Sequence, residues 1–147
     1  MLSLDTGDIT FEEPAVALGP GLTLDAFRDG PAGRSAKLHV ANDPYTSWKL
    51  AGPHALELSF RVTAWFHAQR LYRVHLLAVD PTTENTASGS WDDWSEAQEM
   101  QRKTSHDRWM ARHTGGQSLF DWGEVVSRYD DRAGMAFLDI RYGFQPR

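Results

Sequence analysis

Residues 90–116 read SWDDWSEAQEMQRKTSHDRWMARHTGG, and this stretch predicts the one long helix of the chain. Ser95 followed by Gln98 is a capping-box pattern, in which each side chain bonds a free backbone N–H of the first turn. Ser90 offers an earlier start of the same kind. The glycine pair at 115–116 suits the left-handed conformation that ends many helices. Acidic residues come first and basic residues last, which complements the helix dipole.

Two neighbouring stripes run along this predicted helix, and neither forms a broad apolar face. The first stripe holds Ala97, Met100, Thr104, Met110 and Ala111. The second stripe holds Arg102, His106, Trp109 and His113. So narrow an apolar stripe is typical of a helix that lies on a sheet. We interpret the second stripe as amphipathic residues at the margin between helix and sheet. A contact or ligand patch built from His106, Trp109 and His113 is the functional alternative.

The strongest strand signal is the alternation of apolar and polar residues from Ala55 to His67. The next run, Leu71 to Asp80, also alternates, and the two runs predict an antiparallel pair joined around residues 68–70. We expect the apolar face to be core, and in the second run this face holds Tyr72, Val74, Leu76 and Ala78. The other, mixed face carries Arg61, Trp65, His67, Arg73 and His75.

The rest of the pattern places short strands before these runs and a hairpin after the long helix. The expected elements are one or two strands within 4–18, a short helix at 22–30 with Thr23 as its N-cap, a loop, strands at 37–41 and 45–50, a short apolar segment at 119–122, and a hairpin of 124–129 and 135–142. This order predicts an α+β fold, in which an antiparallel β-sheet (a meander plus a C-terminal hairpin) is covered by one long and one short helix. Because we find no linker or repeat, we expect residues 1–147 to form a single domain.

Composition places the chain among folded proteins and excludes several classes of site. A hydrophobic fraction of 41% and six tryptophans predict a globule rather than a disordered chain. The absence of cysteine excludes disulfides and thiolate zinc sites. The first residues lack the basic and apolar segments of a signal peptide, and no apolar run reaches membrane-spanning length. We therefore expect a cytoplasmic protein without a membrane segment.

The net charge of −5 is unevenly distributed. Residues 1–33 carry six acidic residues against Arg28 alone, and residues 84–99 carry five acidic residues and no basic one. Nucleic-acid binding needs clustered Lys and Arg, so we expect no nucleic-acid partner. A basic protein partner fits this charge, because complementary fields speed encounter. The plain alternative is an acidic surface that keeps the protein in solution.

No standard catalytic or metal motif occurs in the chain. It has no Gly-rich phosphate loop, no paired-histidine zinc helix and no Gly-x-Ser-x-Gly elbow, so we expect no catalytic residue and no cofactor. The six histidines share no metal-ligand spacing, and we expect no metal site. His67 and His75 are placed to face each other across the hairpin, although two ligands without a carboxylate make a poor metal site.

The last third of the chain resembles a known group of proteins. The strings EMQRKTSHDRWMARHTG, DWGEVVSRYD and GMAFLDIRY, within residues 91–142, carry the likeness. Its residues are His106, Asp107, Trp109, Trp122, Gly123, Tyr129, Asp130, Gly134, Ile140 and Tyr142. The stretch resembles small bacterial proteins of the immunity-protein type, from polymorphic toxin or contact-dependent inhibition systems. The resemblance implies a shared fold and carries over no catalytic residue.

These observations lead to a first hypothesis, a non-enzymatic protein-binding protein. Most concretely, it would be an immunity-like inhibitor that covers the active site of a basic toxin domain. Tryptophans would anchor the interface and acidic residues would steer the partner. The expected partner-binding residues are Trp91, Asp92, Asp93, Trp94, Glu96, Glu99, His106, Trp109 and His113.

Two further hypotheses remain open at this point. The alternative function is a small enzyme or small-ligand-binding protein, with a pocket between the sheet and the long helix. That pocket would be lined by Arg61, His67, Arg73 and His75, with His106 opposite. The plain alternative for these side chains is a solvated sheet face with cross-strand pairs. We expect a monomer or a weak homodimer, in which terminal hairpins pair edge to edge and bury Phe137 or Phe144.

Overall fold

The computed structural model describes residues 2–12, 15–55, 58–79 and 95–143. The helices in this part of the chain are α1 (Leu24–Asp29), α2 (Pro31–Ser35) and α3 (Glu96–Thr114). The strands are β1 (Ile9–Phe11), β2 (Val16–Leu18), β3 (Lys37–Asn42), β4 (Tyr45–Ala55), β5 (Leu58–His67), β6 (Arg70–Val79), β7 (Leu119–Phe120), β8 (Gly123–Asp130) and β9 (Met135–Tyr142). None of the described helices has the length and apolar character needed to cross a membrane.

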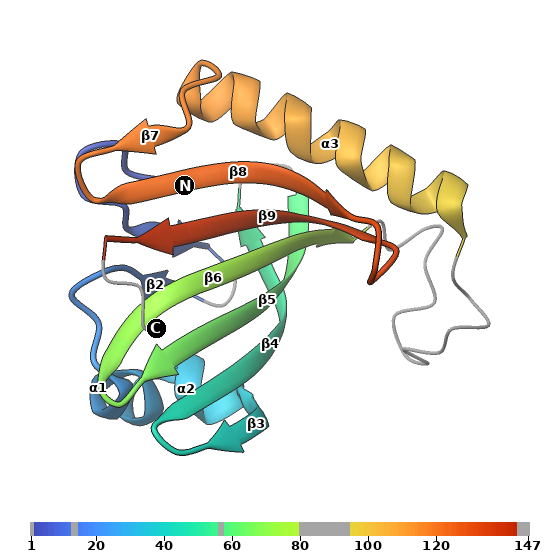
Figure 1. Cartoon of the computed structure of the whole chain (residues 1–147). Helices are drawn as coiled ribbons and strands as arrows, with labels where there is room; N and C mark the ends of the chain where they lie inside the picture. Colours follow the sequence, from blue (N-terminus) through green and yellow to red (C-terminus); the bar gives the residue numbers. More distant parts are fainter. Residues whose placement is uncertain (1, 13–14, 56–57, 80–94, 144–147) are drawn as a thin grey trace.

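The strands form two antiparallel sheets, and the α+β prediction is confirmed. β1 pairs with β2, and a seven-stranded sheet has the order β3-β4-β5-β6-β9-β8-β7 (Figure 1). The predicted meander is β3 to β6, and the predicted terminal hairpin is β8 with β9. These two parts meet where β6 pairs with β9, so Arg73 lies opposite Arg141 although 67 residues lie between them. A pairing between distant parts of the chain therefore joins the meander and the hairpin into one sheet.

The predicted helix ends are also observed. Ser95 caps α3, because its side chain accepts a hydrogen bond from the backbone N–H of Gln98. α3 ends at Gly115, whose φ of 64° is the left-handed conformation. In α1, the Thr23 side chain accepts from the backbone N–H of Ala26. The loop predicted after α1 instead contains the short helix α2, which starts with a proline at its first position.

One face of the seven-stranded sheet carries the core. Phe60 of β5 contacts the ring of Phe11 in the β1–β2 hairpin and the ring of Trp109 in α3, at centroid distances of 6.4 and 6.1 Å. Phe66 of β5 lies 5.2 Å from Phe27 of α1. The helices and the small sheet therefore pack on the same side of the large sheet.

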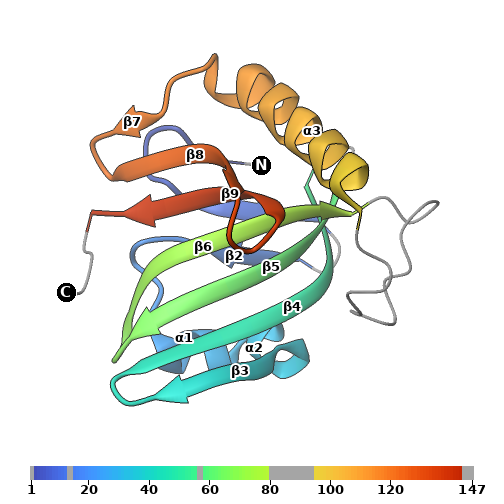
Figure 2. The ribbon, with the colours of Figure 1, turned by 45° about the vertical axis from the view of Figure 1, so that its right-hand side comes forward.

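The opposite face of the seven-stranded sheet, called the open face below, carries the alternate residues of each strand. Its members include Thr63, Trp65, Arg73, His75, Phe137, Asp139 and Arg141. Figures 1 and 2 show no helix or hairpin of the described chain lying across this face. The mixed face predicted from the sequence is thus the face left uncovered by the described elements.

The terminal hairpin occupies an inner position in the sheet, next to the short strand β7. β9 lies between β6 and β8, and β7 pairs with the first residues of β8. Phe137 lies on the open face, where its ring stacks on His75, and Phe144 lies outside the described residues. β9 therefore offers no edge to a second copy, and edge-to-edge pairing of the terminal hairpin through β8 stays a prediction. The outer strands of the sheet are β3 and β7.

Candidate functional site

The structure contradicts the contact patch predicted on α3, because most of its described residues face inward. Glu99, His106 and Trp109 are 3%, 0% and 3% exposed. His113 is half-buried, and its ring lies 4.8 Å from that of Trp109. Only Glu96 of the predicted patch is exposed in the described helix. Outside the described residues lie Trp91, Asp92, Asp93 and Trp94.

The inward-facing polar residues of α3 lie where the hydrogen-bonded pairing of β6 with β9 stops. β6 and β9 pair only from Arg73–Arg141 to Leu76–Leu138. Continuing the same register by two residues would place Ala78 of β6 opposite Ala136 of β9, but the strands separate before this point. The backbone polar groups with which the two alanines would have paired are then left without a strand partner. A buried backbone N–H or C=O without a hydrogen-bond partner costs free energy.

Three polar side chains of α3 supply the missing partners. His106 Nε2 accepts a hydrogen bond from the Ala78 N–H at 3.0 Å, and Arg102 Nε donates to the Ala78 carbonyl at 2.8 Å. Glu99 Oε1 accepts from the Ala136 N–H at 3.3 Å, and Arg102 also donates to Glu99. The prediction that this stripe lies at the margin between helix and sheet is confirmed, and its role is structural.

His106 is an uncharged acceptor at neutral pH. Burial and, after it, the positive charge of Arg102 together lower its pKa from 6.5 to about 3. A protonated ring could not accept the Ala78 N–H. The site therefore favours the neutral imidazole for two independent reasons.

The ligand pocket predicted between the sheet and α3 is wrong. Arg61, His67, Arg73 and His75 lie on the open face, whereas α3 and His106 lie on the core face. His67 pairs with Arg70 and His75 pairs with Thr63, so the two histidines do not face each other. Among the described residues, no group of three or more His, Asp or Glu is arranged to hold a metal ion.

Two of these four residues, Arg73 and His75, meet at Asp139. Asp139 lies on β9 and is 1% exposed. Arg73 donates to both carboxylate oxygens, from Nε to Oδ1 at 2.8 Å and from Nη2 to Oδ2 at 3.0 Å. His75 Nε2 lies 3.3 Å from Oδ1. Arg128 of β8 and Arg141 of β9 each donate from Nε to Oδ2 at 3.1 Å.

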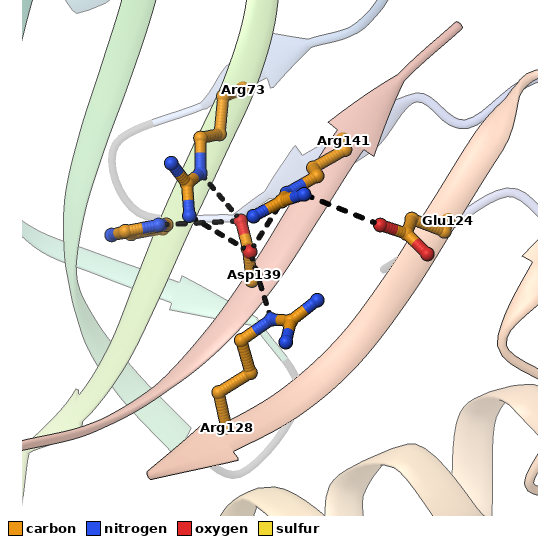
Figure 3. A network of polar contacts seen from close by, with 6 residues as sticks. Arg73, Glu124, Arg128, Asp139 and Arg141 are labelled. Carbon is orange, nitrogen blue, oxygen red and sulfur yellow. Dashed lines mark hydrogen bonds and ion pairs between the residues drawn. The ribbon is translucent and has the colours of Figure 1, made fainter. Parts of the chain in front are cut away.

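Figure 3 shows the arginine side chains reaching Asp139 from three neighbouring strands. We call this group the Asp139 cluster; its members are Arg73, His75, Arg128, Asp139 and Arg141. Glu124 lies at its rim, with Oε1 3.9 Å from Arg141 Nη1. The three arginine side chains remain 29 to 40% exposed while the carboxylate beneath them is buried. The cluster therefore presents guanidinium groups, and not the carboxylate, to the surface.

The charges within the cluster fix two protonation states. Burial alone would raise the pKa of Asp139, but the contacts with His75 and Arg73 outweigh it and hold that pKa well below its usual range. Burial lowers the pKa of His75, although Asp139 opposes this shift. At neutral pH the cluster thus combines three cations with one carboxylate and a neutral imidazole, and it retains a surplus of positive charge.

Aromatic rings flank the cluster. The ring of His75 lies between Trp65 and Phe137, at centroid distances of 4.3 and 4.2 Å. Arg73 lies 5.8 Å from the centre of the Trp65 ring, within the range of a cation–π contact. Trp65 and Phe137 are only partly buried. The site therefore joins partly exposed apolar rings to oriented guanidinium groups.

Sequence reasoning missed Asp139, Arg128 and Arg141. One signal was available: Asp139 stands between Leu138 and Ile140, and aspartate is depleted in strands. The residues next to Asp139 on neighbouring strands could not be predicted from the sequence. Strand alternation assigns each residue to a face, but it gives no register between β6 and β9.

A separate surface hollow of about 500 Å³ lies between the N-terminal turn and β7. Its walls include Leu4, Asp5 and the stacked rings of Phe120 and Trp122. Trp122 Nε1 donates to the Leu4 carbonyl at 2.8 Å. A Cβ on Gly7, whose φ is 80°, would lie 2.5 Å from the Trp122 ring. These contacts show that Trp122 anchors the N-terminal turn, which is a structural role.

Comparison of the chain with protein-family models, with curated proteins and with solved structures gives no match.

Proposed function

We propose that this chain is a non-enzymatic protein-binding protein and that it binds its partner through the open face. The observation that carries the proposal is the Asp139 cluster with its flanking rings on a sheet face that no described helix covers. Tryptophan and arginine are enriched among the residues that dominate interface energies. Partly exposed rings beside arginines are therefore the surface composition expected of a contact site.

The position of the cluster also supports a binding role. Its residues lie on β6, β9 and β8, which are inner strands of the sheet. Each arginine is held by at least one hydrogen bond to Asp139. Side chains that are already ordered lose less conformational entropy when a partner binds.

The charge of this face changes the partner that we expect. The basic partner was predicted from acidic residues at 92–99, of which Glu99 is buried and two lie outside the described residues. The open face has a surplus of arginine, so it suits acidic groups on the partner. Nucleic acid is a poorer candidate, because the chain as a whole carries a charge of −5.

A finer proposal is that the partner is a bacterial toxin domain, inhibited as immunity proteins inhibit their toxins. Its support is the resemblance over residues 91–142, which span α3, β8 and β9. We take the chain to be cytoplasmic, and a monomer or weak homodimer, on the sequence features given above. Two of the strings that carry the resemblance contain Arg128, Asp139 and Arg141, so the finer proposal and the proposed surface draw on overlapping parts of the chain.

The proposal is tested by capturing partners from lysate of the native host with three baits. The baits are the wild type, a Trp65→Ala/Phe137→Ala variant and a Met100→Ala variant. Met100 is 42% exposed on α3, so its variant removes an exposed apolar side chain away from the open face. We expect a protein that the wild type and Met100→Ala retain and that the double variant loses.

Retention by all three baits would contradict the assignment of the open face, and retention by none would contradict protein binding itself. Circular dichroism of each bait confirms that the variants are folded. The finer proposal has its own measurement: the gene of the captured partner is expressed in a test host with and without this chain. Growth inhibition relieved by the wild type, and not by the double variant, is the expected result.

A further inference from the structure

The arginines of the Asp139 cluster have more hydrogen-bond donors than the cluster itself uses. A carboxylate offers about four lone-pair positions, and each guanidinium carries five N–H donors. Asp139 accepts four hydrogen bonds, two from Arg73 and one each from Arg128 and Arg141. The carboxylate is therefore saturated, while most guanidinium N–H groups of the cluster are not engaged by it.

The geometry also keeps the cations close together. Arg73 Nη2, Arg128 Nε and Arg141 Nε all lie within 3.1 Å of the same atom, Asp139 Oδ2. No two of these nitrogens can therefore be farther apart than about twice that distance. Arg73 and Arg141 also stand directly opposite each other in the sheet, a like-charge pair that is unfavourable by itself. A second anion above the cluster would relieve this repulsion.

We infer that the Asp139 cluster is an oxyanion-binding site, in which Arg128 and Arg141, oriented by Asp139, take a carboxylate or phosphate group carried by a protein partner. Arg128 and Arg141 use Nε for Asp139, and Arg141 Nη1 also lies 3.9 Å from Glu124 Oε1. A ligand would therefore take the outer edge of the Arg128 guanidinium and share that of Arg141 with Glu124. Planar guanidinium groups bind carboxylates and phosphates through paired N–H donors. The partly exposed ring of Phe137 lies opposite Arg128 in the β8–β9 register and offers apolar contact beside the anion.

Asp139 acts here as a positioning residue. It is buried and touches no ligand itself, but it orders three flexible side chains before binding. The inference deepens the proposed function, because it names the group that the partner would present. It is tested on the isolated protein with small probes, so its failure leaves the capture experiment unaffected.

The experiment follows the arginine Nε–Hε signals and the Trp65 indole signal by NMR, with titrations of inorganic phosphate, a glutamate-containing peptide and the matching phosphoserine peptide at constant ionic strength. We expect saturable shifts at Arg128 and Arg141. The peptide that saturates at the lower concentration identifies the partner's group as carboxylate or phosphate. Shifts that do not saturate with any of the three probes would overturn the inference.

Three variants separate a built site from general charge attraction. Arg128→Gln leaves Asp139 with Arg73 and Arg141 and should weaken probe binding about tenfold. Arg128→Lys keeps the charge without the planar fork, and should lie between Arg128→Gln and the wild type. Arg132→Gln removes the same charge from an exposed position in the same hairpin and should change binding less than twofold. Equal losses in Arg128→Gln and Arg132→Gln would show attraction without a site and would overturn the inference.

Discussion

Asp139 illustrates, at the scale of single residues, how a charge is tolerated inside a central strand. Moving a carboxylate out of water is costly unless hydrogen bonds and opposite charges replace its hydration. Here four guanidinium hydrogen bonds do so. The alternation of β6 was enough to place Arg73 and His75 on a polar face. The carboxylate that brings them together lies on β9, 64 residues beyond His75, and only the tertiary pairing reveals it.

Replacing Asp139 by Asn should destabilise the protein by about 2 kcal/mol. Removing one partner of a buried ion pair costs roughly 3–5 kcal/mol, and the exposure of the arginines reduces this value through solvent screening. Urea unfolding of both proteins gives the free energy of unfolding. Asp131→Asn, at an exposed position in the β8–β9 turn, is the control with the same chemical change. A loss no larger than that of the control would mean that the three arginines do not depend on Asp139.

His106 should make the fold sensitive to acid. Its pKa is about 3 in the folded state, against about 6.5 in an unfolded chain. The unfolded state therefore binds the proton first as the pH falls, and stability decreases from about pH 6.5 towards pH 3. His106→Gln keeps an acceptor for the Ala78 N–H but cannot be protonated. Its stability should fall less steeply over the same window in unfolding experiments at several pH values.

Other groups also titrate in the acid range, so only the difference between the two proteins is informative. The lowered pKa of His75 acts in the same direction as that of His106. The lowered pKa of Asp139 adds a loss of stability below about pH 4. Both contributions are present in wild type and variant alike. Parallel pH profiles for the two proteins would contradict the role assigned to His106.

At the scale of elements, α3 shows where sequence patterns succeed and where they fail. Its ends were predicted from Ser95 and the glycines after Thr114, because capping is a local interaction between neighbours in the chain. Its buried face was not evident, since Met100 is 42% exposed while the more polar Arg102 is 8% exposed. The orientation of the helix depends on backbone groups of β6 and β9 that need hydrogen-bond partners. These groups lie outside the helix, so its own sequence pattern does not reveal them.

Two substitutions on α3 distinguish the buried stripe from the apolar one. Trp109→Ala removes a side chain that is 3% exposed and contacts Phe60, so it should cost about 3–5 kcal/mol. Met100→Ala should change the stability by less than about 0.5 kcal/mol. Thermal or urea unfolding measures both. Similar losses in the two variants would contradict the observed orientation of α3.

The β5–β6 pair shows a second limit of local patterns. The sequence places Tyr72 on the core face, but the pairing shifts between Trp65 and Phe66, and Leu71 occupies the core at 2% exposure. A β-bulge adds one residue to one strand and reverses the alternation beyond it. The residues from Val74 to Ala78 follow the predicted alternation, because they lie on the regular side of the irregularity.

At the scale of the whole molecule, most strands and both predicted helices could be predicted from the sequence. The way in which these elements pair with one another could not. Turns and alternation predicted the hairpins β5–β6 and β8–β9, which are local. The pairing of β6 with β9 joins the two parts of the sheet, and no local pattern encodes it. The Asp139 cluster spans that junction, so it was as unpredictable as the junction itself.

Amide hydrogen exchange should rank the strands of the sheet. Leu76 and Ile140 are 0% exposed on the two strands that meet at the junction, whereas every residue of β3 is exposed at the sheet edge. We expect the amides of the first group to exchange only through global unfolding, and those of β3 through local opening. Exchange rates measured by NMR should therefore differ by several orders of magnitude. Comparable protection in β3 and β6 would contradict this order of local stability.

The junction between β6 and β9 also has a kinetic consequence. Contacts between residues far apart in sequence form late, because loop closure must precede them. Each hairpin can form early, but Arg73 and His75 meet Asp139 only when the two halves of the sheet dock. The assembled cluster is thus a marker of that docking step. A ligand held there would favour the docked state and slow the separation of the halves, so a partner could prolong the lifetime of the native chain simply by occupying the arginines.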